Sequence, residues 1–281
     1  MKDSLILGIK ISNPDKILFP NQKISKLDIA NYYKKVAKFM LPFVKERLLS
    51  VIKCHQTIDD CFYNKHPSII NKHINAYNDG KHQYFYIKTA SDIIYQVQLG
   101  TTEFHIPCAN VTNMEKPNYM VFDLDPDTNL SLNKLRQGVK HLKKILDNLN
   151  LKSFLKTSGG KGYHVVVPFK DCKNWRSFYN FAKQVALLME KTWPDLYTTN
   201  IKKSKRKNKI FIDYLRNEKN STCIAPYSVR ARQNATVSMP ISWTDLSKIT
   251  PNQITIKTAG KYLEKSHIEW KDFFKVNQII K

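Results

Sequence analysis

The sequence predicts an α+β fold that contains a ferredoxin-like sheet. Two observations in the second part of the chain support this prediction. Short runs of β-branched and aromatic residues are typical of strands, and two longer segments repeat apolar residues at helical spacing. Their order along the chain is β-α-β-β-α-β, which in the split β-α-β arrangement places the strands as 4-1-3-2 across the sheet.

In the first part of the chain, a helix is expected from about Ser25 to Phe39. Ser25 can cap its start together with Asp28, and apolar residues recur at helical spacing after it. Further segments are expected to form strands at 48–52 and 84–87, a strand or short helix at 93–98, and a polar loop at 67–79.

The second part begins near residue 115 and is easier to interpret. Its expected elements are strands at 119–125, 153–157, 163–167 and 210–214, and helices at 131–149 and 175–193. Pro126, Pro168 and Pro194 end three of these elements, because proline cannot donate a backbone hydrogen bond. A glycine-rich turn, 158–162, joins the second and third strands.

Charge is the strongest compositional signal. The 281 residues include 46 Lys and Arg against 23 Asp and Glu, a formal net charge of +23. Such a balance favours a polyanionic partner, first of all nucleic acid, over the alternative of a merely solvated basic surface. Hydrophobic residues make up 42% of the chain, which excludes wholesale disorder.

The chain contains no apolar run of about 18 residues, the length that a membrane span needs. The segment 1–10 lacks the apolar core and cleavage site of a signal peptide. A cytoplasmic protein is therefore expected. The five cysteines are widely spaced and odd in number, which favours free buried thiols in a reducing compartment.

Asp123 and Asp125 lie two apart on one predicted strand, so their side chains share a face. The predicted strand order places Asp213 on the neighbouring strand. Three carboxylates suit Mg²⁺ or Mn²⁺, and two such ions can promote phosphoryl transfer. The alternative is that 125–127, Asp-Pro-Asp, is an ordinary acidic turn.

The glycine-rich turn Ser158–Gly162 has no Walker A spacing. Its backbone N–H groups and Lys161 suit a triphosphate, although a plain hairpin turn is an equal alternative. His164 follows within an apolar strand. It is either a core histidine or, beside three carboxylates, a donor to a phosphate or sugar.

The basic run 202–209 leads into the strand that bears Asp213, which favours phosphate contact over a solvated loop. The segment 62–66, Phe-Tyr-Asn-Lys-His, interleaves aromatic and basic residues, as in base stacking or in a buried strand. Cys54, His55, Cys61 and His66 fit no paired zinc-ligand spacing, so zinc is not expected.

Four motifs occur in the order found in one known family. They are Val-Phe-Asp-Leu-Asp-Pro at 121–126, Thr-Ser-Gly-Gly-Lys-Gly-Tyr-His at 157–164, Ile-Asp-Tyr-Leu-Arg-Asn at 212–217 and Ala-Pro-Tyr-Ser-Val-Arg-Ala-Arg at 225–232. Together they resemble the polymerase domain of bacterial DNA ligase D, in the archaeo-eukaryotic primase superfamily. The resemblance covers nearly the whole chain.

The resemblance implies an archaeo-eukaryotic primase fold and a single primase-polymerase domain over 1–281. Within it, an N-terminal α/β module, 1–115, is expected to carry the 5′-phosphate and template contacts. An RRM-like catalytic module, 116–281, is expected to carry the chemistry.

The implied activity is template-dependent nucleotidyl transfer that fills gaps and extends ends in non-homologous end joining. Two Mn²⁺ or Mg²⁺ ions and an NTP or dNTP are expected, with ribonucleotides favoured. The DNA partner is a duplex with a gap or 3′ overhang and a 5′-phosphate. No ligase or nuclease module is expected here, so a separate ligase and an end-binding protein such as Ku are implied.

Two other functions remain open from the sequence. One is a primase of a mobile element or replicon, which starts chains without a primer. The other is a non-catalytic DNA-binding module that recruits repair partners, although such a module has little use for three clustered carboxylates.

The resemblance also implies roles for individual residues. The expected metal ligands, which are also the catalytic residues, are Asp123, Asp125 and Asp213. The expected nucleotide contacts are Lys53, His105, Ser158, Gly159, Lys161, His164, Arg216 and Arg230. The expected DNA contacts are Asn13, Lys16, Lys26, Phe62, Tyr63, Lys65 and Arg206. Two positions depart from the family pattern: Arg216 stands where some members have Gln, and Tyr163 where Leu is more usual.

Overall fold

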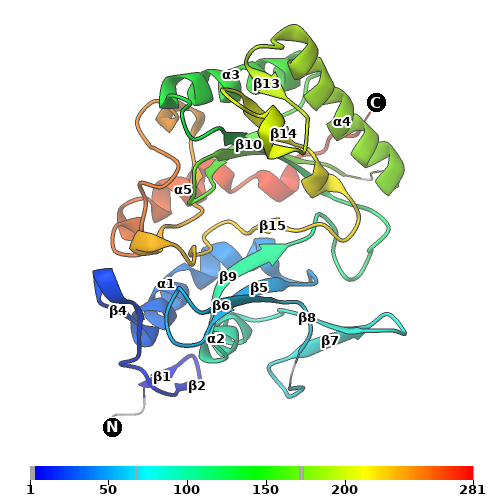
Figure 1. The fold of residues 1–281 in the computed structure, drawn as a ribbon. Coiled ribbons are helices and arrows are strands. Elements are labelled where there is room, and N and C mark those ends of the chain that lie inside the picture. The colour runs from blue at the N-terminus through cyan, green and yellow to red at the C-terminus, as the bar shows by residue number, and fades with distance from the viewer. Residues whose placement is uncertain (1–3, 68, 171, 173, 281) are drawn as a thin grey trace. The chain divides into compact units, whose positions relative to one another are not determined.

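A computed structural model describes residues 4–67, 69–170, 172 and 174–280 (Figure 1). The described chain forms two compact units. The first comprises Met1–Pro107, Ile224–Ser238 and Ile254–Leu263, and the second comprises Cys108–Cys223, Met239–Gln253 and Glu264–Lys281. Because both units are discontinuous in sequence, one division near residue 115 does not describe them. Residues 1 and 281, the outer ends of the two predicted modules, and residue 68 of the predicted loop 67–79 lie outside the described residues.

The second unit is built on a six-stranded sheet with the order β13-β14-β10-β12-β11-β16. These strands are β13 (Tyr197–Thr198), β14 (Ile210–Asp213), β10 (Tyr119–Pro126), β12 (Tyr163–Pro168), β11 (Phe154–Thr157) and β16 (Pro240–Ile241). The four central strands confirm the predicted order 4-1-3-2. The two-residue edge strands β13 and β16 were not predicted, because so short a segment has no readable alternation.

Helices α3 (Leu132–Asn148) and α4 (Trp175–Thr192) pack beside each other against this sheet (Figure 1). Ser131 caps α3 as predicted, accepting from the Lys134 backbone N–H. A Cβ at Gly138 of α3 would lie 2.9 Å from Ile210 and 3.5 Å from Leu124, so glycine allows the helix to approach. Leu124 therefore faces the helices, and its neighbours Asp123 and Asp125 face the other side of the sheet.

The first unit contains helix α1 (Lys26–Val44), which begins with the predicted capping box of Ser25 and Asp28. Residues 93–98, ambiguous in the sequence, lie in helix α2 (Ala90–Gln98). A four-stranded sheet has the order β15-β9-β5-β6. Its strands are β15 (Cys223–Ile224), β9 (Thr101–Ile106), β5 (Ser50–Cys54) and β6 (Cys61–Asn64).

The remaining elements are short. They include the pairs β1 (Ser4–Ile6) with β2 (Ile9–Ile11), β3 (Ile17–Phe19) with β4 (Ile24–Ser25), and β7 (Asn75–Asn78) with β8 (Gln83–Tyr86), helix α5 (Leu263–Trp270) and several 3-10 helices. The loop predicted at 67–79 is wrong at its end, where β7 pairs with β8. The polar residues of β7 alternate between intermediate and exposed positions and leave no apolar pattern to read.

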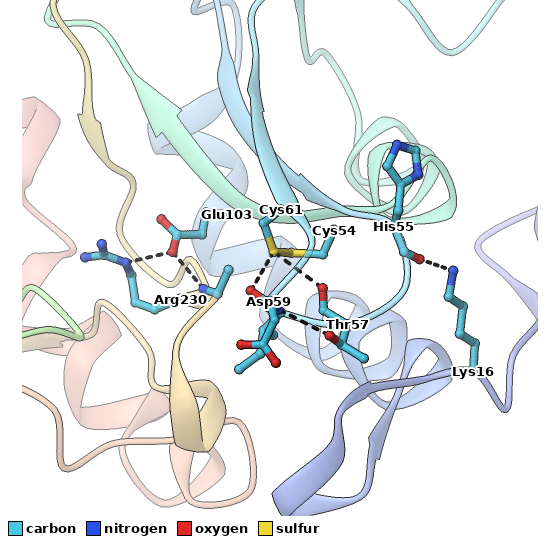
Figure 2. The surroundings of a disulfide bond; sticks show 10 residues. Lys16, Cys54, His55, Thr57, Asp59, Cys61, Glu103 and Arg230 are labelled. Atoms are coloured by element: carbon cyan, nitrogen blue, oxygen red, sulfur yellow. Dashed lines mark hydrogen bonds and ion pairs between the residues drawn. A yellow bond between two sulfur atoms is a disulfide. The ribbon is translucent and has the colours of Figure 1, made fainter.

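The expectation of five free thiols is wrong for two of them. Cys54 and Cys61 form a disulfide that closes the hairpin of β5 and β6 (Figure 2). The antiparallel register places the two residues directly opposite each other, with Cα atoms 4.0 Å apart. Cys108, Cys172 and Cys223 are buried thiols outside this disulfide, as predicted.

Among the described residues, no helix combines the length and apolar character needed to cross a membrane.

Candidate functional site

Four chemically active side chains lie in one row across the sheet of the second unit. On successive strands, Asp213 of β14 is paired with Asp123 of β10, Asp123 with His164 of β12, and His164 with Lys156 of β11. Directly paired residues point to the same face, so the row runs carboxylate, carboxylate, imidazole, ammonium. Asp125 lies two residues beyond Asp123 and shares that face.

The predicted strand order thus brings Asp123, Asp125 and Asp213 together. Burial and the charges of Asp213 and Asp125 raise the pKa of Asp123 to about 7. Burial also raises the pKa of Asp213, although the positive charge of Arg216 opposes the shift. Carboxylates in this arrangement repel each other, and the repulsion favours binding of cations.

Two arginines supply part of the missing positive charge. Arg216 Nε lies 3.0 Å from Asp213 Oδ2, and Arg206 lies 4.0 Å from Asp125 Oδ2. Within the described ranges, no three Asp, Glu, His or Cys side chains converge in a geometry that could hold a metal ion. The donor set itself fits divalent cations, because carboxylate oxygens are the ligands that Mg²⁺ and Mn²⁺ prefer. Binding would require the carboxylates to turn from arginine to metal.

The glycine-rich turn uses its own polar groups internally. Ser158 Oγ accepts hydrogen bonds from the N–H groups of Gly160 and Gly162, and the Gly159 N–H donates to the Pro251 carbonyl. These three loop amides therefore donate to groups of the protein itself in this structure. The exposed Lys161 is the group of the turn that can still offer positive charge.

Gly162 has a packing role that the sequence did not reveal. A Cβ at this position would lie 2.1 Å from the Leu124 carbonyl oxygen, so only glycine lets the turn approach β10. The turn is thereby fixed beside the strand that carries Asp123 and Asp125.

Asn217 is a further residue that sequence reasoning missed. Its side chain is fully buried and donates to the Val121 carbonyl at 2.7 Å while accepting from the Val121 N–H at 2.8 Å. It thus joins the segment after β14 to β10. Asn217 lies next to Arg216 in the motif Ile-Asp-Tyr-Leu-Arg-Asn, which is the signal that could have found it.

In the first unit, Glu103 of β9 organises two predicted nucleotide contacts. Its carboxylate lies 2.8 Å from His105 Nε2, accepts from Arg230 Nε at 3.1 Å and accepts from the Ala231 N–H at 2.7 Å. Burial would raise the pKa of Glu103, but His105 and Arg230 outweigh it and lower that pKa to about 2. Glu103 was not predicted, because its partner Arg230 lies 127 residues away.

The comparisons with known proteins agree with this geometry. Residues 25–270 match the family model for the LigD primase-polymerase domain. The chain is 31% identical to a multifunctional non-homologous end joining protein LigD of Pseudomonas aeruginosa, covering 97% of this chain and 34% of the relative. It is 28% identical to a bifunctional LigD of Bacillus subtilis, covering 95% of this chain and 44% of that protein.

The chain belongs to the LigD primase-polymerase domain family. A solved polymerase domain of Mycobacterium tuberculosis Ligase D, in complex with DNA, matches with a TM-score of 0.82 at 27% identity, covering 94% of this chain and 98% of that domain. The primase-type α+β fold expected from the sequence is thus confirmed. The chain is a template-dependent nucleotidyltransferase of a metal-dependent family. It spans less than half the length of the two LigD relatives.

The predicted 5′-phosphate residues of this LigD-type domain lie at the start of the first unit. Lys16 donates to the His55 carbonyl, and Lys26 donates to the Ser12 carbonyl and to Gln98 Oε1, each at 3.0 Å. Asn13 and Lys16 line a shallow cavity of about 420 Å³, which Gln56 helps to close. Burial and the charge of Lys16 lower the pKa of Lys26 to about 8.

The predicted template contacts lie on β6. Phe62 and Tyr63 are 41% and 50% exposed, so the alternative of a buried strand is wrong. Phe62 stacks on His55, and Lys65 lies over the ring of Tyr63. Lys53, opposite Phe62 on β5, is nearly buried, and burial lowers its pKa.

Arg206, predicted as a DNA contact, contacts other residues of the second unit. Its guanidinium stacks 3.5 Å from the centre of the Phe211 ring and donates to the carbonyls of Asn200 and Ile201. The lysines at 202, 203, 205 and 207 are exposed around it. They, rather than Arg206, form the accessible basic part of this loop.

Proposed function

We propose that this chain fills gaps and extends 3′ ends at DNA breaks during non-homologous end joining. The observation that carries the proposal is the direct pairing of Asp123 with Asp213, with Asp125 on the same face. The names of the LigD relatives support a role in end joining, and the solved neighbour is a polymerase domain in complex with DNA.

Asp123, Asp125 and Asp213 would hold two Mn²⁺ or Mg²⁺ ions. Bound there, the ions supply positive charge that favours the deprotonated primer hydroxyl and the departing pyrophosphate. The repulsion that raises the pKa of Asp123 supports this assignment, because bound cations would relieve it.

The reaction itself follows from the substrates. The primer 3′ oxygen forms a bond to the α-phosphorus of the nucleotide, and the bond from that phosphorus to pyrophosphate breaks. In this proposal Lys161 pairs with triphosphate oxygens, and His164, within reach of Asp123, helps to orient the carboxylate.

The remaining predicted contacts are part of the proposal. For the nucleotide they are Lys53, His105, Ser158, Gly159, Arg216 and Arg230. For the DNA they are Asn13, Lys16 and Lys26 at the 5′-phosphate, Phe62, Tyr63 and Lys65 at the template, and Arg206 in the basic loop. The net charge of +23 supports sequence-independent binding to the phosphate backbone, which salt is expected to weaken.

The finer features are inferred from the family resemblance. They are a preference for ribonucleotides, action in the cytoplasm on nucleoid DNA, and cooperation with Ku and a separately encoded ligase.

The test is nucleotide addition on a short gapped duplex with a 5′-phosphate. Each ribo- and deoxyribonucleotide is supplied in turn, with Mn²⁺ or Mg²⁺, to the wild type and to Asp213→Ala. Asp195→Asn, at an exposed aspartate of the same unit, is the matched control. Templated addition by the wild type and the control, lost in Asp213→Ala with DNA affinity retained, is expected.

Equal addition by Asp213→Ala and the wild type would refute the metal assignment. Addition on unprimed single strands, with none at gaps, would favour the primase alternative. Tight DNA binding without addition under any condition would favour the recruitment module.

A further inference from the structure

A buried thiol contacts the imidazole in the catalytic row. Cys223 Sγ lies 3.1 Å from His164 Nδ1, and both residues are almost fully buried. The other ring nitrogen, His164 Nε2, lies 3.4 Å from Asp123 Oδ1. The imidazole therefore connects a thiol on one side to a proposed metal ligand on the other.

We propose that Cys223 is a positioning residue that sets the tautomer of His164 and thereby orients the Asp123 carboxylate. The inference rests on the proposed function, in which Asp123 holds a metal ion. A neutral imidazole has one N–H and one bare nitrogen. If the thiol donates to Nδ1, the ring hydrogen is on Nε2 and points to Asp123.

The opposite tautomer is unfavourable in this geometry. With Asp123 ionised, it would place the bare Nε2 opposite a carboxylate oxygen, so that two lone pairs face each other across 3.4 Å. Burial raises the pKa of the Cys223 thiol to about 11, so the sulfur keeps its hydrogen at neutral pH. A protonated thiol can donate to Nδ1, which is the direction that the proposal requires.

The consequence concerns Asp123. An N–H from His164 to Oδ1 restrains rotation of the carboxylate, which is otherwise repelled by Asp125 and Asp213. Partners of this kind, one step removed from a metal, typically change metal affinity or activity by about 10–100-fold when they are lost. Cys223 is expected to act in this way without touching the metal or the substrate.

The first experiment reads the tautomer directly. The ring nitrogens of His164 are observed by ¹⁵N NMR in the metal-free protein at about pH 8.5, above the pKa of Asp123, with the signals assigned by their loss in His164→Gln. In the wild type the hydrogen is expected on Nε2. In Cys223→Ala a mixture of tautomers is expected, and Cys223→Ser, whose hydroxyl can still donate, is expected to restore the Nε2–H form.

The second experiment titrates Mn²⁺ into the same proteins by calorimetry, without nucleotide. Cys223→Ala is expected to bind Mn²⁺ about tenfold more weakly, and Cys223→Ser to recover most of that loss. Cys172→Ala, which removes another buried thiol of the second unit, is the control and is expected to match the wild type. Circular dichroism confirms that each variant is folded.

The inference is overturned if wild-type His164 carries its hydrogen on Nδ1, or if Cys223→Ala leaves both the tautomer and Mn²⁺ affinity unchanged. A changed tautomer with unchanged Mn²⁺ affinity would also overturn it. Failure of the proposed function itself would be visible separately, as Mn²⁺ binding that survives unchanged in Asp213→Ala.

Discussion

Two sites of this chain hold buried carboxylates, and they differ in how the negative charge is balanced. In the first unit, one carboxylate, Glu103, contacts both His105 and Arg230, and its pKa is lowered to about 2. In the second unit, Asp123 lies near two further carboxylates, and its pKa is raised to about 7. The negative charge of Glu103 is thus balanced by neighbouring groups of the protein, whereas the negative charge of Asp123 is opposed by its neighbouring carboxylates.

The difference indicates that Glu103 contributes to the stability of the fold, whereas Asp123, Asp125 and Asp213 contribute to cation binding. A carboxylate with its counter-charges and hydrogen bonds in place contributes to stability. A group of repelling carboxylates reduces stability, and it is tolerated where a bound cation compensates. Substitution among the three aspartates should therefore reduce activity without reducing stability, whereas substitution of Glu103 should reduce stability.

The largest expected effect is on activity in the second unit. Asp213→Asn removes one charge of the cluster while preserving its shape, and nucleotide addition is expected to fall by about 1,000-fold or more, equivalent to about 4 kcal/mol. Because the substitution relieves repulsion with Asp123, the melting temperature without divalent ions is expected to stay level or rise. Addition assays and thermal unfolding measure the two effects.

The ion pair between Arg216 and Asp213, at 3.0 Å, acts against this expected gain in stability, because Asp213→Asn also removes the counter-charge of Arg216. The double variant Asp213→Asn with Arg216→Gln removes both charges and separates the two contributions. A marked loss of stability in both the single and the double variant would contradict the comparison, since it would show that Asp213 also holds the fold.

The next effect is on stability in the first unit. Glu103→Gln leaves Arg230 without its carboxylate, and removing one partner of such a buried pair is expected to cost about 2–4 kcal/mol of unfolding free energy. Denaturant unfolding of the wild type and the variant measures this difference. Thr101→Ser, on the same strand, is a conservative control.

The same pair of proteins gives a pH test. Since the pKa of Glu103 is lowered from 4.5 to about 2, its contribution is present above about pH 4.5 and is lost as the pH falls toward 2. The stability difference between the wild type and Glu103→Gln is therefore expected to shrink between pH 5 and pH 3. A constant difference over that range would show that the ion pair does not stabilise the fold.

A smaller effect is expected at the disulfide of the first unit. Cys61→Ser opens a closed loop of few residues between β5 and β6, which is expected to lower the unfolding free energy by about 2 kcal/mol. Thermal unfolding with and without a strong reductant measures it. The wild type and the control Cys172→Ser, which both contain the disulfide, should lose stability in reductant, whereas Cys61→Ser should not change further.

Equal responses of all three proteins to reductant would mean that the disulfide does not contribute. The prediction matters for function because the closed loop carries the His55 carbonyl, to which Lys16 donates (Figure 2).

The sequence predicted the second unit better than the first for a physical reason. Its strands are buried and bounded by proline and glycine, and connectivity then decides their order. The pairing of Asp123 with Asp213 followed from that order. The first unit contains short strands such as β7, whose sequence Asn-Ala-Tyr-Asn shows no alternation of apolar and polar residues, and their pairing depends on tertiary contacts.

The missed residues share a different cause. Glu103, Lys156 and Asn217 are buried polar groups whose partners come from other segments, and local sequence does not show which distant residue will face them. The disulfide was missed because it depends on the exact register of a hairpin. Motifs that act through neighbouring positions can be read from sequence, whereas contacts that depend on register cannot.

The smallest expected effect concerns the 5′-phosphate preference and its dependence on pH. The pKa of Lys26 is lowered from 10.5 to about 8 by burial and by Lys16. A lysine shifted in this direction loses its charge as the pH rises through 8, so its attraction for phosphate is present below that pH and fades above it. The preference for 5′-phosphorylated over 5′-hydroxyl gaps is expected to fall about three- to tenfold from pH 7 to pH 9.

Two variants make this prediction specific to Lys26, with competition binding of the two gapped duplexes as the measurement. Lys26→Met should show a weaker preference that no longer changes over this range. Lys26→Arg should keep its preference at pH 9, because a guanidinium stays charged. A fall of equal size in the wild type and Lys26→Met would assign the titration to another group. The phosphate, with a second pKa of about 6, only gains negative charge above pH 7, so its own ionisation cannot weaken binding. A fall confined to the wild type therefore reports loss of the positive charge of Lys26.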